Sequence, residues 1–272
     1  MTSATRFSVI LILPLTIVVV AFFLLPMAEL FARSFVSRNG GITYAEILAT
    51  PRYLSSLGAT LIVAALTTVI TLALSTLVGL LLARSRFPGR SLLLAVLTFP
   101  LAFPGVVVGF LVILLAGRQG LIGEVTRLAT GEKLVFAYSM TGLLVGYLYF
   151  SIPRVLLTIV AAAEKLDPAL EEAARSLGAG PWRVLSDIIL PALRPAMLAS
   201  GALAFATAMG AFGTAFTLAT NIDVLPMVIY TEFTLNANIA MAAALSIVLG
   251  LITWLALAIA RQASGASVAA AG

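Results

Sequence analysis

Six long stretches of the chain contain no charged residue, and each is long enough to cross a lipid bilayer as a helix. A helical span needs about 20 mostly apolar residues, and every one of these windows reaches that length. In chain order they are Phe7–Ala28, Tyr53–Ala83, Ser91–Gly117, Leu134–Pro153, Pro195–Ile222 and Phe233–Ala260. The pattern predicts an all-α integral membrane protein that forms a single transmembrane domain over residues 1–272. Its six transmembrane helices are expected at about residues 7–30, 56–83, 91–116, 136–163, 195–219 and 239–261.

The first window could also be a secretory signal, because Arg6 precedes an apolar run. The hydrophobic region of a signal peptide has about 7–15 residues, and this run is longer. It also shows no clear small-x-small cleavage site. We therefore interpret it as an uncleaved first span.

The one long polar segment, Leu166 to Pro195, has the local signals of a short helix at its start. Asp167-Pro168 supplies an N-cap acceptor followed by proline at the first helical position. Gly178 suits the C′ position, where a left-handed conformation ends a helix. The first helix is therefore expected at about Pro168–Leu177.

A second amphipathic helix is expected to start at Gly180-Pro181 and to stop at Pro191.

The first helix has a polar face, on which Glu171 and Arg175 form a favourable i,i+4 pair. Its other face is apolar or small, with Leu166, Leu170, Ala173, Ala174 and Leu177. An exposed helix of this kind fits a groove on a partner protein. The alternative is a helix lying on the membrane surface, against which its weak basic character argues.

Residues that disturb a regular helix lie in the third predicted span. Pro100 and Pro104, with Gly105 directly after, remove helix hydrogen bonds and should bend or break the helix. Backbone groups that lack helical hydrogen bonds are tolerated in a membrane only inside the protein or along a water-filled cavity. The bend is therefore either part of a transport path or hinge, or a static kink.

The second and fifth spans carry faces of small and hydroxyl residues. In the fifth, the spacing of Ala206, Gly210 and Thr214 predicts a close-packing face against an intrachain neighbour or a second copy. In the second, the alternatives are a pore-facing stripe or plain helix packing for Thr60, Ala64, Thr67, Thr68, Thr71 and Ser75. Candidate path or hinge residues are Pro100, Pro104, Gly105, Thr207, Gly210, Gly213 and Thr214.

Charge sets the expected orientation. With the N-terminus inside, the inner segments hold ten basic residues and the outer segments hold six. Basic residues favour the cytoplasmic side, and the cluster Arg84-Ser-Arg86-Phe-Pro-Gly-Arg90 is the clearest signal. The expected topology is N-in and C-in, with the polar segment between spans four and five in the cytoplasm.

Composition excludes several classes of function. The chain is 61% hydrophobic and 10% charged, whereas soluble domains carry about 25% charged residues. It contains no His and no Cys, which removes His or Cys metal sites, thiol nucleophiles and His-based triads. The net charge of +5 is attributed to loops that orient the spans. We expect contact with membrane lipid, no nucleic acid and no metal.

The polar segment resembles a known motif. Glu172-Ala173-Ala174, three residues, Gly178, nine residues, Ile188, one residue and Leu190-Pro191 are similar to the EAA loop of permease subunits in binding-protein-dependent ABC importers. The rest of the chain, about Phe7–Arg261, resembles the six-span type I permeases of that family. Its third-span sequence FPLAFPGVVVG and the run from Gly210 to Phe216 resemble the spermidine/putrescine, iron, thiamine and phosphonate branch.

This resemblance implies a mechanism and a set of partners. A soluble extracytoplasmic binding protein would deliver the substrate to two permease subunits, which form a homo- or heterodimer in a bacterial inner membrane. Two ATPase subunits would each grip one EAA loop, and ATP-driven closure would switch the spans between inward- and outward-open states. A polyamine is the substrate expected from the branch. The implied coupling residues are Glu171, Glu172, Ala173, Ala174, Arg175, Leu177, Gly178, Ile188, Leu190 and Pro191.

The chain itself is not expected to be an enzyme. Its lysines, Lys133 and Lys165, are not preceded by glycine, so a phosphate-binding Gly-Lys loop is missing. No cofactor is expected here, since ATP and Mg²⁺ would bind the partner ATPase.

Three other classes of protein compete with this interpretation. A secondary transporter would place ionisable residues inside its spans, whereas Arg154 and Glu29 only border the charge-free windows. An intramembrane enzyme would need a nucleophile with a base, or metal ligands. A passive channel would leave the cytoplasmic helices unexplained.

Overall fold

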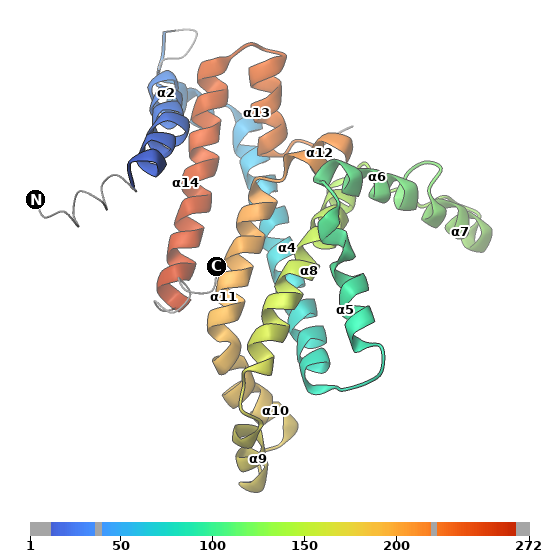
Figure 1. Cartoon of the computed structure of the whole chain (residues 1–272). Coiled ribbons are helices and arrows are strands. Elements are labelled where there is room, and N and C mark those ends of the chain that lie inside the picture. Colours follow the sequence, from blue (N-terminus) through green and yellow to red (C-terminus); the bar gives the residue numbers. More distant parts are fainter. Residues whose placement is uncertain (1–11, 36–39, 219–221, 265–272) are drawn as a thin grey trace, which may run out of the picture. The chain divides into compact units, whose positions relative to one another are not determined.

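The computed structural model describes residues 12–35, 40–218 and 222–264. In this part of the chain six helices are long and apolar enough to cross a membrane, which confirms the predicted number of spans (Figure 1). They are Ile12–Arg33, Pro51–Arg84, Gly105–Thr130, Met140–Glu164, Pro181–Met209 and Ile239–Ala263. The predicted first and fifth spans also include residues 7–11 and 219, which lie outside the described residues.

The helices are numbered in chain order, with gaps where short turns intervene. The longer ones are α4 (Pro51–Arg84), α6 (Gly105–Ala116), α8 (Met140–Glu164), α11 (Leu190–Met209) and α14 (Ile239–Ser264). The shorter ones are α2 (Leu25–Arg33), α3 (Thr43–Ala49), α5 (Arg90–Thr98), α7 (Leu121–Thr130), α9 (Pro168–Ser176), α10 (Pro181–Val184), α12 (Phe212–Leu218) and α13 (Leu225–Thr234). Two π turns precede α2 and α11, at Val20–Leu24 and Leu185–Ile189.

The chain divides into two compact units. The first is drawn from Met1–Ser55 and Val228–Gly250. Within it, the Tyr53 hydroxyl donates to a carboxylate oxygen of the buried Glu232 at 3.1 Å, and the Ser34 and Tyr44 hydroxyls lie 2.8 Å apart. The expectation of one domain over residues 1–272 stays a prediction.

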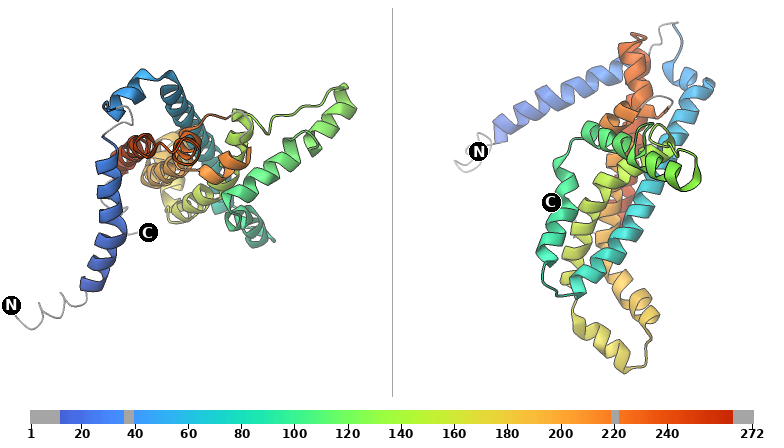
Figure 2. Two further views of the ribbon diagram at one scale, coloured as in Figure 1. Left: turned by 90° about the horizontal axis from the view of Figure 1, so that it is seen from above. Right: turned by 90° about the vertical axis from the view of Figure 1, so that its right-hand side faces the viewer.

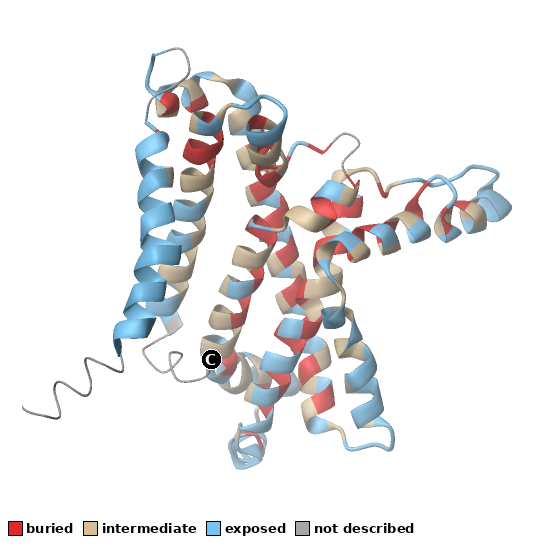
Figure 3. Cartoon of the chain, turned by 45° about the horizontal axis from the view of Figure 1, so that its top comes forward, coloured by how far each residue is buried: buried red, intermediate tan, exposed pale blue. Residues whose placement is uncertain are grey.

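The second unit, drawn from Ser56–Met227 and Leu251–Gly272, has a core where α4, α8 and α11 meet. Val155 and Ile159 of α8 pack with Leu193 and Ala204 of α11, and apolar side chains of α4 cover them. A Cβ added at Gly79 would lie 2.9 Å from Ile159 Cγ2, so α4 and α8 approach too closely for a larger residue. Figure 3 shows the buried residues concentrated on the facing sides of these helices.

The hydroxyl stripe of α4 serves packing. Thr60, Thr67, Thr71 and Ser75 are all buried. Thr60 Oγ1 donates to the Ser56 carbonyl and accepts from the Leu225 backbone N–H at 2.8 Å, while Ser75 Oγ donates to a carbonyl of α8. Burial of this face within the chain supports the packing alternative, while the Thr67 and Thr71 hydroxyls have no hydrogen-bond partner among the described residues.

The third span breaks where its prolines predict. Helix α5 ends at Thr98 and is followed by one 3-10 turn, Phe99–Ala102. Phe103 and Pro104 then adopt extended backbone, with ψ of 132° and 152°, before α6 begins at Gly105. The predicted break is confirmed, but the predicted bounds of the third span, 91–116, were wrong. Arg90–Ala102 is a separate shorter apolar helix before the break, and the helix long enough to cross a membrane is Gly105–Thr130.

The prediction of one continuous fifth helix over residues 195–219 was wrong. Helix α11 ends at Met209, and α12 starts at Phe212. Residues 206, 210 and 214 therefore do not share one helical face. Tyr147 of α8 donates its hydroxyl to the Ala211 carbonyl at 2.7 Å, so the broken backbone keeps a hydrogen-bond partner inside the protein.

The predicted stop at Pro191 was also wrong. The helix that starts at Pro181 continues to Met209 through the π turn Leu185–Ile189. In this turn the Leu190 N–H donates to the Leu185 carbonyl five residues back. The wider turn shifts the hydrogen-bond register directly before Pro191, which lacks an N–H, and the helix passes through the proline.

Candidate functional site

Residues 167–189, here called the coupling hairpin, form α9, a turn and α10 beyond the ends of α8 and α11 (Figures 1 and 2). Asp167 Oδ1 accepts from the Ala169 N–H at 2.9 Å, and Gly178 has φ of +87°. The Gly178 N–H donates to the Arg175 carbonyl, and the next N–H reaches back to the Ala174 carbonyl. These bonds form a Schellman motif, and both predicted ends of the helix are confirmed within one residue.

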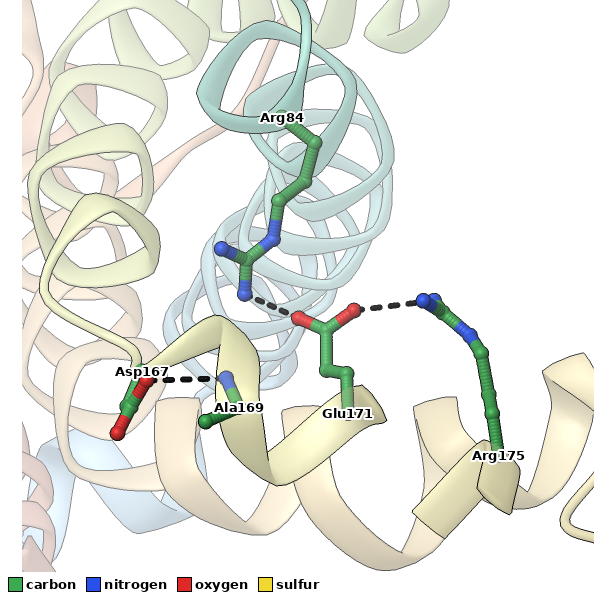
Figure 4. Close-up of polar contacts among 5 residues, drawn as sticks. All are labelled: Arg84, Asp167, Ala169, Glu171 and Arg175. Carbon is green, nitrogen blue, oxygen red and sulfur yellow. Dashed lines mark hydrogen bonds and ion pairs between the residues drawn. The ribbon is translucent and has the colours of Figure 1, made fainter. Parts of the chain in front are cut away.

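Glu171 attaches the coupling hairpin to the membrane part of the unit. Its carboxylate lies between two guanidinium groups, those of Arg84 at the end of α4 and Arg175 on α9 (Figure 4). The predicted Glu171–Arg175 pair is present at 3.2 Å. Glu171 is only 7% exposed, so it points into the chain instead of toward a partner protein. The expected contact of Glu171 with an ATPase stays a prediction.

The face of α9 opposite Glu171 is apolar and turned to solvent. Leu170, Ala173 and Leu177 share it, at spacings of three and four residues, and all three are exposed. Leu177 and the nearby Trp182 are 89% and 82% exposed. Such side chains are rarely left in water unless a partner covers them, so this face is the part of the hairpin suited to docking.

The other predicted coupling residues fall into two places. Glu172 and Gly178 are exposed on the hairpin, and Ala174 is half-buried. Ile188, Leu190 and Pro191 lie at the π turn and the start of α11. The EAA spacing thus covers both the exposed hairpin and its junction with the fifth span.

Arginines of the predicted cytoplasmic cluster border a cavity of about 710 Å³ beside α9. Arg90 pairs with Glu164 at the end of α8 and donates from Nε to the Leu82 carbonyl at 2.8 Å. Together with the Arg84–Glu171 pair, these contacts join the α4–α5 connection to α8 and α9. The sequence indicated this cluster only as an orientation signal, and its pairing was missed.

A second cavity, of about 350 Å³, lies at the breaks of spans three and five. Of the predicted path residues, its walls include Pro100, Gly105, Thr207, Gly210, Gly213 and Thr214, while Pro104 is not among the lining residues. The structure therefore brings residues from separate spans to one site. Phe150 and Arg154 of α8 also line it, and the sequence analysis did not select them.

Glycines allow the helix ends around this cavity to meet. A Cβ at Gly146 of α8 would lie 2.7 Å from Thr214 Cγ2, and one at Gly109 of α6 would lie 2.5 Å from Thr217 Cβ. The Thr214 hydroxyl donates to the Gly105 carbonyl at 2.9 Å. Close approach and this bond hold α12 against the start of α6.

Arg154 is the charged side chain of the cavity wall. Its Nη1 donates to Thr207 Oγ1 at 3.0 Å, and that hydroxyl donates to the Leu203 carbonyl at 2.7 Å. Arg154 borders the fourth charge-free window but falls within the predicted fourth span, 136–163, and the structure has it inside helix α8. The uncharged run from Val155 to Ala163, which follows Arg154, was the sequence signal that the span continues beyond this residue.

Comparison with known proteins identifies the class. Residues 75–264 match the family described as "Binding-protein-dependent transport system inner membrane component", and the chain belongs to this family. It is 42% identical over 155 residues to the molybdenum transport system permease protein ModB of Escherichia coli (strain K12), covering 56% of this chain and 67% of that protein. It is 34% identical over 199 residues to the sulfate transport system permease protein CysT of the same strain, covering 73% and 70%.

The fold agrees with this assignment. The crystal structure of a bacterial alginate ABC transporter, in complex with an alginate pentasaccharide-bound periplasmic protein, superposes with a TM-score of 0.81 at 17% identity. The match covers 94% of this chain and 93% of that one. The chain is thus a multi-pass permease subunit of an ABC importer, whose ATPase is a separate subunit. The relatives named above give no support to the spermidine/putrescine branch.

Proposed function

We propose that this permease imports a tetrahedral oxyanion, molybdate or sulfate, in place of the polyamine expected from the sequence. The molybdenum and sulfate permeases among its relatives support this substrate class. The charge of the inner cavity supports it as well, because Arg154 lies among lining residues that include no acid. A cation on the wall attracts an anion and repels a polyamine, which is itself cationic.

Transport is driven through the coupling hairpin. The observation that carries this part of the proposal is the exposed face of α9, with Leu177 at its end and Trp182 of α10 both uncovered near the turn at Gly178. An ATPase subunit docks on this face, and its closure on ATP moves the hairpin. The hairpin continues into α11 without a break and is tied to α4 by Glu171 and Arg84. Its movement is therefore passed to two spans.

The complete transporter has further chains. A second permease subunit, either a copy or a paralogue, forms the other wall of the path, and an extracytoplasmic binding protein delivers the substrate. ATP and Mg²⁺ bind the ATPase subunits. Substrate choice is shared with the binding protein, so the assay needs the whole assembly.

The test is uptake into proteoliposomes that contain this permease with its co-expressed ATPase and binding protein. ATP-dependent uptake of molybdate or sulfate is expected, with no uptake of putrescine. Omission of ATP serves as the control for leakage. Uptake of putrescine with neither oxyanion transported would overturn the assignment of substrate class.

A further inference from the structure

Arg154 lies deep in the membrane part of the second unit. It stands ten residues before Glu164, the last residue of α8, which places it about 15 Å from that end at 1.5 Å per residue. Its partner Thr207 stands 13 residues after Arg194 on α11, or about 20 Å away. The distances along α8 and α11 both place Arg154 and Thr207 far from the charged cytoplasmic ends of these helices.

The Arg154 side chain has no counter-ion in the part of the chain that the structure describes. Within the described residues it forms no ion pair, and its hydrogen bond goes to the neutral Thr207 hydroxyl. It is also exposed on the surface of this chain. A charged side chain at such depth normally faces a water-filled cavity or the interior of a bundle, because lipid solvates it poorly. The cavity at the broken spans is the matching environment.

The Arg154 guanidinium has N–H donors that its hydrogen bond to Thr207 does not use. It carries five N–H groups in a planar fork, and Thr207 accepts from Nη1. The Thr207 proton is directed to the Leu203 carbonyl, so the threonine holds the guanidinium in place. The remaining donors suit the oxygens of a tetrahedral dianion, which a planar fork binds through two parallel hydrogen bonds.

We propose that Arg154, oriented by Thr207, is the anion-binding group of the translocation path and contacts the oxyanion as it crosses the membrane. This inference rests on the proposed oxyanion import and adds the residue that makes the path selective for negative charge. A structural alternative is that Arg154 only stabilises the end of α11, where a cation is favoured by the helix dipole. The two roles separate when charge selectivity is measured apart from stability.

The first experiment compares Arg154→Gln, Arg154→Lys and the control Arg127→Gln in the reconstituted transporter. Arg127 is an exposed arginine on α7 and is not among the residues that line the cavity. We expect Arg154→Gln to lower ATP-driven uptake of molybdate or sulfate at least about tenfold, the cost of a charge-assisted hydrogen bond. Assembly and ATP hydrolysis should persist, Arg154→Lys should recover part of the uptake, and Arg127→Gln should behave as wild type. Uptake by Arg154→Gln near the wild-type rate would overturn the proposal.

A second experiment does not depend on the substrate. The chain has no native cysteine, so Ala211→Cys places its single thiol in the cavity wall. In membranes, an anionic methanethiosulfonate reagent should modify this thiol several-fold faster than a cationic one, and adding Arg154→Gln should abolish the preference. A thiol that neither reagent reaches, or a preference that survives Arg154→Gln, contradicts the proposal. If the preference holds but neither oxyanion is transported, only the proposed substrate fails.

Discussion

Neutralising Glu171 should detach the coupling hairpin from α4 without changing its docking face. Glu171→Gln keeps the size of the side chain and removes the charge that holds Arg84 and Arg175. The amide cannot accept from both guanidinium groups as a carboxylate does. Arg84 is then left partly buried without its counter-ion. We expect the hairpin to lose its fixed position while Leu177 and Trp182 stay exposed.

The size of the effect follows from the exposure of the pair. Breaking a fully buried pair from one side costs about 3–5 kcal/mol, and an exposed pair contributes about 0–1 kcal/mol. The side chains of Glu171 and Arg84 are 10% and 30% exposed, so the loss should fall between these limits, at about 2 kcal/mol. That corresponds to a shift of about 30-fold in the ratio of attached to detached hairpin.

Two measurements on the reconstituted transporter check this prediction. The first is the amount of oxyanion taken up per ATP hydrolysed. This ratio should fall because ATP hydrolysis continues, while the movement of the hairpin is no longer passed to α4. The second is hydrogen exchange of the α9 amides, which should become faster as local opening becomes less costly. Glu171→Gln should show both the lower uptake per ATP and the faster hydrogen exchange.

Arg175→Gln is the matched control. It removes a partner of the same carboxylate, but Arg175 is 59% exposed and lies one helical turn away. Exposed i,i+4 pairs contribute only about 0.3–0.5 kcal/mol, so hydrogen exchange of the α9 amides in this variant should stay near the wild-type rate. Equally accelerated exchange in Glu171→Gln and Arg175→Gln, or wild-type coupling in Glu171→Gln, would refute the attachment of α9 through Arg84.

Three further variants test other parts of the account. Glu172→Lys should leave membrane insertion intact but abolish ATP-driven uptake, because Glu172 is exposed and forms no ion pair within the described residues; normal uptake would contradict its coupling role. Gly178→Val should strain the left-handed turn by at least about 1–2 kcal/mol and uncouple transport, whereas Gly178→Asn, which tolerates this conformation, should retain most uptake. Gly146→Val should lower the melting temperature of the purified transporter through a clash with Thr214 costing about 1–3 kcal/mol, while Gly58→Val, whose added Cβ meets nothing within 4 Å, should lower it far less.

Features that depend on local sequence were predictable. The charge-free windows located six spans because a bilayer demands an apolar length that no other environment requires. Asp167-Pro168 and Gly178 marked the ends of α9 because caps are made by neighbouring residues. Pro100 and Pro104 marked the break of the third span because a proline removes its own hydrogen bond.

Features that depend on distant residues were not predictable. The break after Met209 is stabilised by Tyr147, which comes from another span. Glu171 pairs with Arg84, which lies 87 residues earlier, so this one residue of the polar face of α9 faces the chain, while Glu172 and Arg175 stay exposed. Pro191 does not end its helix, because a π turn directly before it changes the hydrogen-bond register.

The substrate could not be predicted from the sequence pattern for a different reason. The motif FPLAFPGVVVG contains no charged residue and marks where the chain bends, so it gives no information on the sign of the substrate. Arg154 lies inside the predicted fourth span, 136–163, but the sequence analysis noted it only as bordering a charge-free window and drew no conclusion about the substrate from it. The relatives are molybdenum and sulfate permeases, and we propose an oxyanion in place of the expected polyamine on that basis.

The most direct test of the central claim is whether the exposed face of α9 binds the ATPase. The permease is purified from membranes with the genes that neighbour its own co-expressed, as wild type, as Leu177→Asp and as the control Leu48→Asp. Leu48 is 72% exposed on α3, in a segment expected on the opposite side of the membrane. Recovery of an ATPase with wild type and Leu48→Asp, and its loss with Leu177→Asp, is the predicted result. Undiminished recovery with Leu177→Asp would contradict the account of how this permease is driven.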